Sequence, residues 1–283
     1  MDISVNVGYL RKRRGNLPPR PFAECAKIVK EAGFNYVDFS ANSYIGTPDW
    51  AETAKRHSEE FNKIGVTVNQ THAPYVFDKI PEEDYKEHMR RSFEVVKIVG
   101  AEQIVIHADK YVPDENGYDF NKALTEIYDF YAPYVEYAKK NNFGVAIENL
   151  FEPQDQTFRN RFTSKIEEQI AIIEKFNDPI VTACWDVGHG KVANRDKHIE
   201  EIAKLGSLVT ATHIHDNIYG IDQHSPVYLG DCDWEAVVRH LHSINYKGKF
   251  TLELVYGIIP DELLPRYMKL YYDTTEYLLN SVK

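Results

Sequence analysis

The sequence predicts an α/β protein in which a single (β/α)8 barrel domain spans residues 1–283. Short apolar runs typical of strands alternate with helical patterns over eight successive units, and this alternation predicts a parallel sheet. No shift in composition separates the units, so a second domain is not expected. The length of 283 residues also fits a closed barrel of this kind, which typically needs about 250 residues.

The first four units follow one another with a glycine at the end of most helices. Strands are expected at 3–7, 36–39, 66–70 and 103–106, because these runs are short and apolar. Helices are expected at about 22–32, 48–64, 81–99 and 120–140. The first three of these helices stop at Gly33, Gly65 and Gly100, and glycine is a common residue at a helix end.

The second four units repeat this pattern. Strands are expected at 145–147, 180–184, 209–213 and 250–252, and helices at about 164–176, 198–205, 234–244 and 261–279. The helix-to-strand links are short and usually carry glycine, as at Gly206 and Gly248, whereas the strand-to-helix links are long and rich in charged and aromatic residues. In (β/α)8 enzymes the active site lies on the strand-to-helix rim, so we expect the functional residues there.

The bulk composition argues against several classes of protein. Hydrophobic residues make up 43% of the chain, which suits one large core, and no long apolar run predicts a membrane span. The net charge of −10 argues against nucleic acid and anionic membranes as partners. The three cysteines are widely spaced, and the first residues do not resemble a signal peptide. We therefore expect a soluble, cytoplasmic protein.

A His, Asp or Glu side chain stands where each of six consecutive strands meets its long loop. In strand order these residues are His72, His107, Glu148, Asp186 with His189, His213 and Glu253. Roughly one residue in five is Asp, Glu or His, so one such position means little, whereas six in succession are difficult to attribute to chance. Imidazole and carboxylate ligands together suit Zn²⁺, Mn²⁺, Fe²⁺ or Co²⁺. The pattern predicts a metal site but does not select the metal.

Each of these residues also has a purely structural interpretation. His72 and His107, taken alone, are more typical of packed or capping histidines, and Asp186 could belong to an ordinary turn. Glu148 and Glu253 differ, because each directly follows an apolar run and a buried carboxylate needs a partner. Packing or solvated roles are assigned to the histidines on expected helices: His57, His88, His198, His240 and His242.

The segment after the seventh strand has the highest density of candidate ligands. The strand ends at His213, and His215 and Asp216 follow, where we expect them to orient the His213 ring. Asp222 and His224 lie in the next loop. Two roles stay open for them, contact with a substrate or ligation of an additional metal ion.

Basic and aromatic residues also fall on the expected rim. Arg11, Lys12, Arg13 and Arg14 lie in the first long loop, where they could recognise a phosphate or carboxylate of a substrate or simply be solvated. The rim aromatics could stack on sugar C–H surfaces or anchor loops. They are Tyr9, Tyr44, Tyr75, Tyr111, Phe151, Phe158, Tyr219 and Tyr256.

Together, the rim motifs resemble the xylose isomerase-like TIM-barrel superfamily over essentially the whole chain. The motifs are Thr71-His72-Ala73-Pro74-Tyr75, Ile106-His107, Ile147-Glu148-Asn149, Trp185-Asp186-Val187-Gly188-His189, His213-Ile214-His215-Asp216-Asn217, Asp222-Gln223-His224, Leu229-Gly230 and Leu252-Glu253-Leu254. The superfamily holds sugar-phosphate isomerases and epimerases, ketose 3-epimerases, inosose dehydratases and type IV AP endonucleases. The motifs are specific for the superfamily but do not select one activity.

The resemblance implies a divalent metal (Mn²⁺, Zn²⁺, Mg²⁺ or Co²⁺), as one ion or more, on Glu148, Asp186, His213 and Glu253. It implies an isomerase or epimerase that acts on a sugar or sugar phosphate by proton transfer through a metal-stabilised enediolate. Glu148 and Glu253 would be the catalytic residues that exchange the proton. Substrate binding is assigned to His189, His72, His107, His224 and Asp222. Beyond the sugar, the expected partner is another copy of the chain, in a homodimer or homotetramer.

Two positions depart from the ketose 3-epimerase pattern, because a substrate-binding Glu and Arg of that group are replaced by Gln154 and Tyr219. The main alternative is a type IV AP endonuclease-like multi-zinc phosphodiesterase. Every ligand of that site has a candidate here: His72, His107, Glu148, Asp186, His189, His213, Asp222, His224 and Glu253. The charge of −10 argues against DNA as its substrate. A sugar-acid or inosose-type dehydratase is a further alternative, and intact carboxylates argue against a silent sugar-binding barrel.

Overall fold

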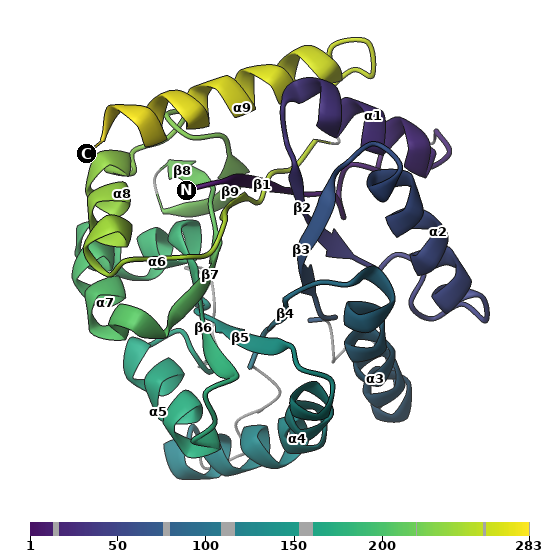
Figure 1. Ribbon diagram of the computed structural model, residues 1–283. Helices are drawn as coiled ribbons and strands as arrows, with labels where there is room; N and C mark the ends of the chain where they lie inside the picture. Colours follow the sequence, from purple (N-terminus) through teal and green to yellow (C-terminus); the bar gives the residue numbers. More distant parts are fainter. Residues whose placement is uncertain are drawn as a thin grey trace.

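A computed structural model describes residues 1–13, 17–75, 80–108, 117–152, 161–218, 220–256 and 259–282. Among these residues, eight parallel strands form one sheet in the order β10-β1-β2-β3-β4-β5-β6-β7. They are β1 (Ile3–Asn6), β2 (Tyr36–Ser40), β3 (Thr67–His72), β4 (Gln103–Ile106), β5 (Gly144–Glu148), β6 (Val181–Asp186), β7 (Val209–His213) and β10 (Phe250–Leu252). Figure 1 shows the sheet curved into a ring with helices around its outside. The predicted (β/α)8 barrel is confirmed.

The barrel closes between β7 and β10 through a single bridge rather than a full ladder. Ile214 pairs with Leu252 in parallel orientation. The N–H of Ile214 donates to the carbonyl of Thr251 at 2.8 Å, and the N–H of Glu253 donates to the carbonyl of Ile214 at 3.0 Å. This closure places the residue after β10, Glu253, beside the end of β7.

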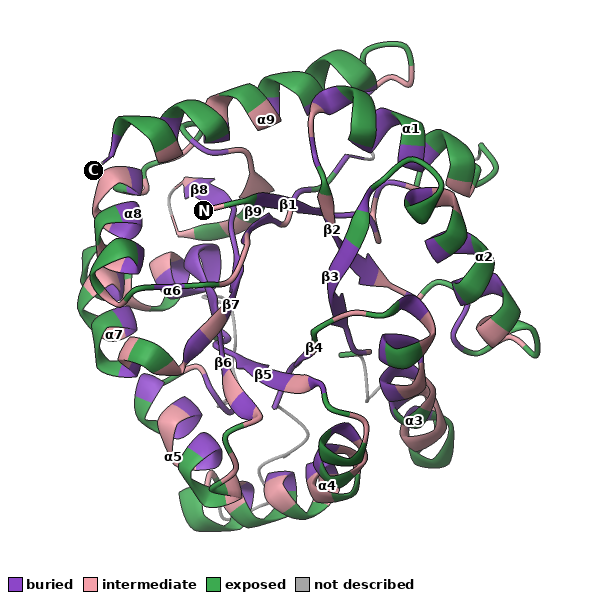
Figure 2. Cartoon of the chain, in the orientation of Figure 1, coloured by how far each residue is buried: buried purple, intermediate pink, exposed green. Residues whose placement is uncertain are grey.

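The outer helices match the predicted units. They are α1 (Phe22–Ala32), α2 (Trp50–Asn62), α3 (Glu82–Val99), α4 (Phe120–Lys140), α5 (Ile166–Phe176), α7 (His198–Leu205), α8 (Trp234–Ser243) and α9 (Leu264–Ser281). Gly33 and Gly100 adopt left-handed conformations, with φ of 114° and 73°, directly after α1 and α3. Figure 2 shows buried residues on the sides of the helices that face the barrel and exposed residues on the opposite sides. No described helix is long and apolar enough to cross a membrane.

Two segments expected to be loops are regular structure. The helix α6 (Val187–Asn194) begins directly after β6, because the Asp186 carboxylate accepts the N–H of His189 at 2.6 Å and caps the first turn. The strands β8 (Asp216–Ile218) and β9 (Ile221–Ser225) form an antiparallel hairpin after β7. Short 3-10 turns, η2 (Arg195–Lys197) and η3 (Gly206–Leu208), precede and follow α7. Both unexpected elements carry candidate ligands, so the fold holds these residues on ordered backbone.

The alternation of side chains along the strands places the candidate ligands inside the barrel. Val105, Ala146, Cys184 and Ala211 form a small buried cluster separate from the main hydrophobic core. Because successive residues of a strand point to opposite faces, the residue two positions further along points the same way. Those residues are His107, Glu148, Asp186 and His213, respectively. A layer of small apolar side chains therefore lies directly beneath the ligands.

Candidate metal centre

Glu148 lies at the centre of the candidate site. Its Oε2 atom lies 3.2 Å from Nε2 of His72 and 3.2 Å from Nε2 of His107. Its Oε1 atom lies 3.2 Å from Nδ1 of His189 and 3.3 Å from Nδ1 of His213. The side chain is 1% exposed. The ends of β3, β4, β5 and β7 and the first turn of α6 thus converge on one buried carboxylate.

The four residues predicted to bind a metal lie together. Glu148, Asp186, His213 and Glu253 each offer one ligand atom within 4.8 Å of the other three. Nδ1 of His213 is 3.2 Å from Oε2 of Glu253 and 3.9 Å from Oδ2 of Asp186. The sequence pattern therefore predicts a set of side chains that is compact in the folded chain.

The charge balance of this group is unusual for a buried site. Burial alone would raise the pKa of Glu148, but the His213 and His107 rings beside it hold that pKa well below its usual range. Within the described parts of the chain, no Lys or Arg side chain forms an ion pair with Glu148, Asp186 or Glu253. Buried carboxylates balanced only by histidines form a site that a divalent cation would stabilise.

The donor atoms fit such a cation. Three carboxylates and one imidazole supply oxygen and nitrogen ligands of the kinds that Zn²⁺, Mn²⁺, Mg²⁺ and Co²⁺ accept. Nδ1 of His213 is buried and faces the carboxylates, and it forms no hydrogen bond with the residues that the structure describes. A buried nitrogen without a partner needs an explanation, and ligation of a cation supplies one.

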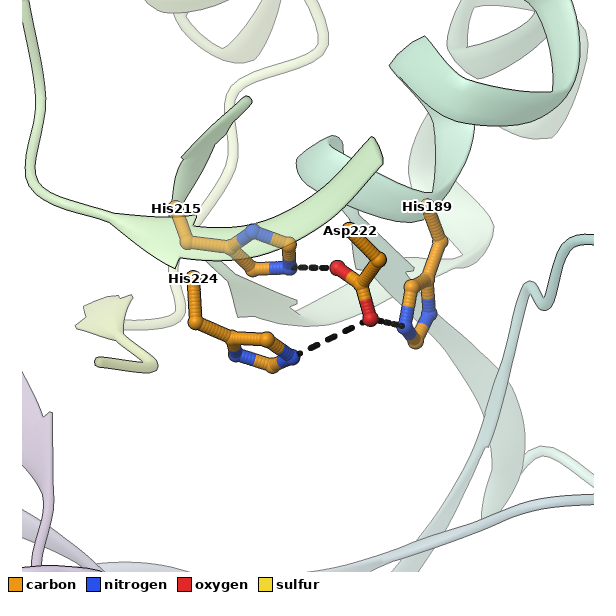
Figure 3. A group of neighbouring side chains, drawn as sticks. All are labelled: His189, His215, Asp222 and His224. Atoms are coloured by element: carbon orange, nitrogen blue, oxygen red, sulfur yellow. Dashed lines mark ion pairs between the residues drawn. The ribbon is translucent and has the colours of Figure 1, made fainter. Parts of the chain in front are cut away.

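A second group of side chains lies beside the first. Figure 3 shows His189, His215 and His224 pointing toward Asp222. Oδ2 of Asp222 lies 3.3 Å from Nε2 of His224 and 3.8 Å from Nε2 of His189, and Oδ1 lies 3.7 Å from Nε2 of His215. One atom from each of the four lies within 4.8 Å of the others. Nε2 of His215 is also 3.1 Å from Oδ1 of Asp186, so the two groups are in contact.

Backbone contacts fix two of these imidazole rings. Nδ1 of His189 lies 3.0 Å from the carbonyl of Asn149, and Nδ1 of His224 lies 3.0 Å from the carbonyl of Glu253. A proton on Nδ1 donates to each carbonyl, which leaves Nε2 facing Asp222. This is the arrangement by which proteins orient histidines that bind metals.

His215 and Asp216 were predicted to orient the His213 ring, but their contacts in the structure are with other residues. The His215 ring occupies the space above Gly188, where a Cβ would lie 1.8 Å from its Cε1 atom. Asp216 accepts a hydrogen bond from Nε1 of Trp234 at 2.8 Å and so ties β8 to α8. The reason is that the chain enters the β8–β9 hairpin after His213, where His215 contacts Asp186 and Asp216 contacts Trp234.

Sequence reasoning missed Asp38, which contacts His213 from the other side. Oδ2 of Asp38 is 3.5 Å from Nε2 of His213, and the Asp38 side chain is 2% exposed. A carboxylate facing the far nitrogen helps to hold a metal-binding histidine in the correct orientation. The sequence did contain a signal for this residue, because Asp38 stands between Val37 and Phe39 within a strand. Both faces of a parallel barrel sheet are buried, so an Asp in such a strand needs a partner.

A cavity of about 660 Å³ opens beside Glu253 and His72. Of the predicted rim aromatics, Tyr9, Tyr44 and Tyr75 line it. Tyr256 instead anchors a loop, because its buried hydroxyl donates to Oδ1 of Asn6 at 3.2 Å, and Phe151 packs on His189 with ring centroids 5.0 Å apart. Arg14, Tyr111, Gln154, Phe158 and Tyr219 lie outside the described residues.

A (β/α)8 barrel with carboxylates and imidazoles clustered at its strand ends defines a class of barrel proteins with a candidate metal centre. Within that class, the chain belongs to the xylose isomerase-like TIM barrel family, whose model matches residues 26–270. The predicted superfamily is therefore confirmed.

Named relatives and solved structures align with most of this chain. L-ribulose-5-phosphate 3-epimerase UlaE of Shigella flexneri serotype 5b (strain 8401) is 23% identical over 250 residues, which cover 83% of this chain and 84% of that protein. The structure of a D-tagatose 3-epimerase-like protein matches with a TM-score of 0.75 and 19% identity over 99% of both chains. The IOLI protein, solved with a zinc atom, matches with a TM-score of 0.74 and 14% identity over 100% of this chain and 99% of its own. The structural likenesses show a common fold.

Proposed function

We propose that the protein is a divalent-metal-dependent isomerase or epimerase of a sugar or sugar phosphate. The observation that carries this proposal is the group formed by Glu148, Asp186, His213 and Glu253, which lies at the strand ends beside the cavity. Similarity to proteins named as sugar epimerases supports the same reaction class. The cation and its ligands remain part of the proposal.

The two glutamates would move the proton. A cation bound at this centre would polarise a substrate carbonyl and acidify the adjacent C–H. Glu253 lines the cavity and is 12% exposed, so its carboxylate is accessible to a substrate carbon. Glu148 lies against the same nitrogen of His213 and is the second carboxylate available for proton exchange. Removal by one and return by the other would give an epimer.

Histidines around the glutamates would contact substrate oxygens. His72 lines the cavity directly. Burial opposes protonation of His189, but Asp186 and Glu148 beside it raise the pKa of its ring to about 9. Nδ1 of this ring lies 3.0 Å from the carbonyl of Asn149, which fixes the ring so that Nε2 is the atom available to a substrate oxygen. His107, Asp222 and His224 complete the residues proposed to surround the substrate.

Solvent hydrogen exchange tests the proposal. The metal-replete protein would be incubated in D₂O with a panel of ketoses, aldoses and their phosphates, and the sugars analysed by NMR. We expect deuterium at a C–H next to the carbonyl of at least one sugar, together with its epimer or isomer. Absence of exchange in every member of the panel would argue strongly against the proposed reaction.

The second group of ligands favours one other candidate, a multi-zinc phosphodiesterase of the type IV AP endonuclease kind. His189, His215, Asp222 and His224 could hold an additional ion, and His72, Glu148 and His213 form a third close group. This candidate predicts nicking of duplex DNA at an abasic site by zinc-loaded protein. Intact abasic DNA after prolonged incubation eliminates it.

A further inference from the structure

The cavity beside Glu253 extends beyond the candidate metal centre. Its volume of about 660 Å³ is typical of small-molecule sites, which span roughly 300–1,000 Å³. Glu253 and His72 form one part of its wall. Another part is formed by Arg11 and Lys12 from the first rim loop and by Arg56 from α2. A ligand that fills the cavity would therefore meet the candidate metal centre and three cations.

The Arg11 guanidinium is held in place but keeps donors available. Its Nε donates to the carbonyl of Arg20 at 3.2 Å, while the N–H of Arg20 donates to the carbonyl of Arg11 at 2.8 Å. The guanidinium carbon lies 4.0 Å from the centroid of the Phe22 ring. Neither Nη group forms a hydrogen bond or ion pair with the residues that the structure describes. Both groups are thus free to bind an anion.

Lys12 and Arg56 also lack a carboxylate partner in the described ranges. Within the described part of the chain, the side chain of Arg56 forms one hydrogen bond, a long one of 3.5 Å from Nη2 to the hydroxyl of Thr53. Three carboxylates are among the described lining residues: Asp38 and Glu253 face His213, and the third is Asp49. Its oxygens accept hydrogen bonds from the hydroxyls of Thr47 at 2.8 Å and Thr53 at 3.1 Å. Apart from Asp38 and Glu253, the charged residues of the lining are thus three cations and one carboxylate, Asp49, that is already hydrogen-bonded.

Neighbouring basic side chains have structural partners instead. Arg13 and Arg20 both pair with Asp261, the latter at 2.6 Å from its Nη2 atom. Nε of Arg20 lies 3.2 Å from Glu24. These contacts tie the first rim loop to the segment before α9. The basic run is thus divided between residues that hold the loop and residues that face the cavity.

We propose that Arg11, Lys12 and Arg56 bind the phosphate monoester of a sugar phosphate whose carbonyl end lies at the candidate metal centre. This assignment rests on the proposed function and names its substrate class. Guanidinium and ammonium groups are the side chains that bind phosphate oxygens. Among the lining residues other than Asp38 and Glu253, which face His213, three cations outnumber the one carboxylate, Asp49, and this balance suits a phosphate dianion better than a single carboxylate.

Calorimetric titration of the metal-replete protein tests the subsite without requiring turnover. The ligands are ribulose 5-phosphate and fructose 6-phosphate, each compared with its free sugar, and glucuronate as a carboxylate. We expect one phosphate to bind at least tenfold more tightly than its free sugar. Arg11→Ala should weaken that phosphate by about tenfold or more, because a charged hydrogen-bond donor is lost. The triple variant with Lys12→Ala and Arg56→Ala should bind phosphate and free sugar alike.

Lys55→Ala is the matched control, because Lys55 is an exposed neighbour of Arg56 on α2 that does not line the cavity. Equal affinity of the wild type for phosphates and free sugars, no binding of any phosphate, or an unchanged triple variant would overturn the subsite. Glucuronate binding as tightly as the phosphates would refute phosphate as the ligand. Phosphate-dependent binding without any hydrogen exchange would instead refute the proposed reaction and leave the subsite standing.

Discussion

Glu148 and Glu253 are chemically identical side chains in different surroundings. Glu148 is 1% exposed and its oxygens face four histidine rings. Glu253 follows the short strand β10, borders the cavity and is 12% exposed. At the scale of the residue, we therefore assign Glu253 to direct contact with the substrate carbon and Glu148 to the second proton transfer.

Replacement of either glutamate by glutamine tests this assignment. Glu148→Gln and Glu253→Gln should each lower kcat by about a hundred- to ten-thousand-fold, because an amide cannot accept the substrate proton. The rates would be measured as hydrogen exchange with the active sugar. Glu83→Gln, at an 85% exposed position on α3, is the control and should retain full activity. Turnover at the wild-type rate by either site variant would refute the proton-transfer assignment.

Asp222 separates the two groups of ligands experimentally. It belongs to the group with His189, His215 and His224 but not to the group around Glu148. The proposed isomerase, in which Asp222 contacts the substrate, predicts one tight Zn²⁺ ion in the wild type and in Asp222→Asn. The phosphodiesterase candidate instead predicts a second, weaker ion in the wild type that is absent in Asp222→Asn, while the tighter ion persists. Metal content after dialysis provides the measurement. Loss of the tighter ion in this variant would mean that the two groups form one site.

At the scale of the element, α2 carries a histidine that packs as an apolar residue. His57 is 1% exposed and stacks on Phe22 with ring centroids 3.8 Å apart, and it lies near Phe39 and Phe61. Neither ring nitrogen forms a hydrogen bond with any residue in the described ranges. Burial, aided by the Arg11 charge, lowers the pKa of His57 to about 3. The packing role expected for this helical histidine is confirmed.

His57 therefore contributes to acid sensitivity. Below its unfolded pKa of 6.5, the unfolded chain binds a proton that the folded chain rejects, so the free energy of unfolding falls as the pH drops toward about 3. The expected slope is about 1.4 kcal/mol per pH unit for this one proton. In His57→Leu that contribution should vanish, which urea unfolding at pH 7 and pH 5 can measure. His242→Leu, at an exposed position, should keep the full slope, and an equal slope in His57→Leu would contradict the account.

The elements that sequence reasoning missed are those whose residues also match the pattern of metal ligands. Asp186 caps α6, but in the sequence it was interpreted as a metal ligand, so its capping role was not predicted. The hairpin of β8 and β9 contains Asp222 and His224, which read as a ligand-bearing loop. This hairpin brings both residues against His189 and His215, so the second group of ligands depends on it.

At the scale of the whole molecule, the barrel explains why so much of the site was predictable. Parallel strands end at one rim, so residues far apart in sequence, from His72 to Glu253, converge once the strands are identified. Distances and cavities do not follow from strand order. The sequence therefore predicts the ligand groups, whereas the position of Asp38 behind His213 and the separation of Arg11 from Arg13 require the folded chain.

The central claim is that the group of Glu148, Asp186, His213 and Glu253 uses a divalent cation to exchange a substrate proton. Its most direct test is the rate of solvent-deuterium incorporation into the active sugar before chelation, after chelation and dialysis, and after restoration of Mn²⁺, Zn²⁺, Mg²⁺ or Co²⁺. The account predicts that exchange is lost with the metal and returns with at least one of these ions. An undiminished exchange rate in protein shown by metal analysis to be free of divalent ions would contradict it.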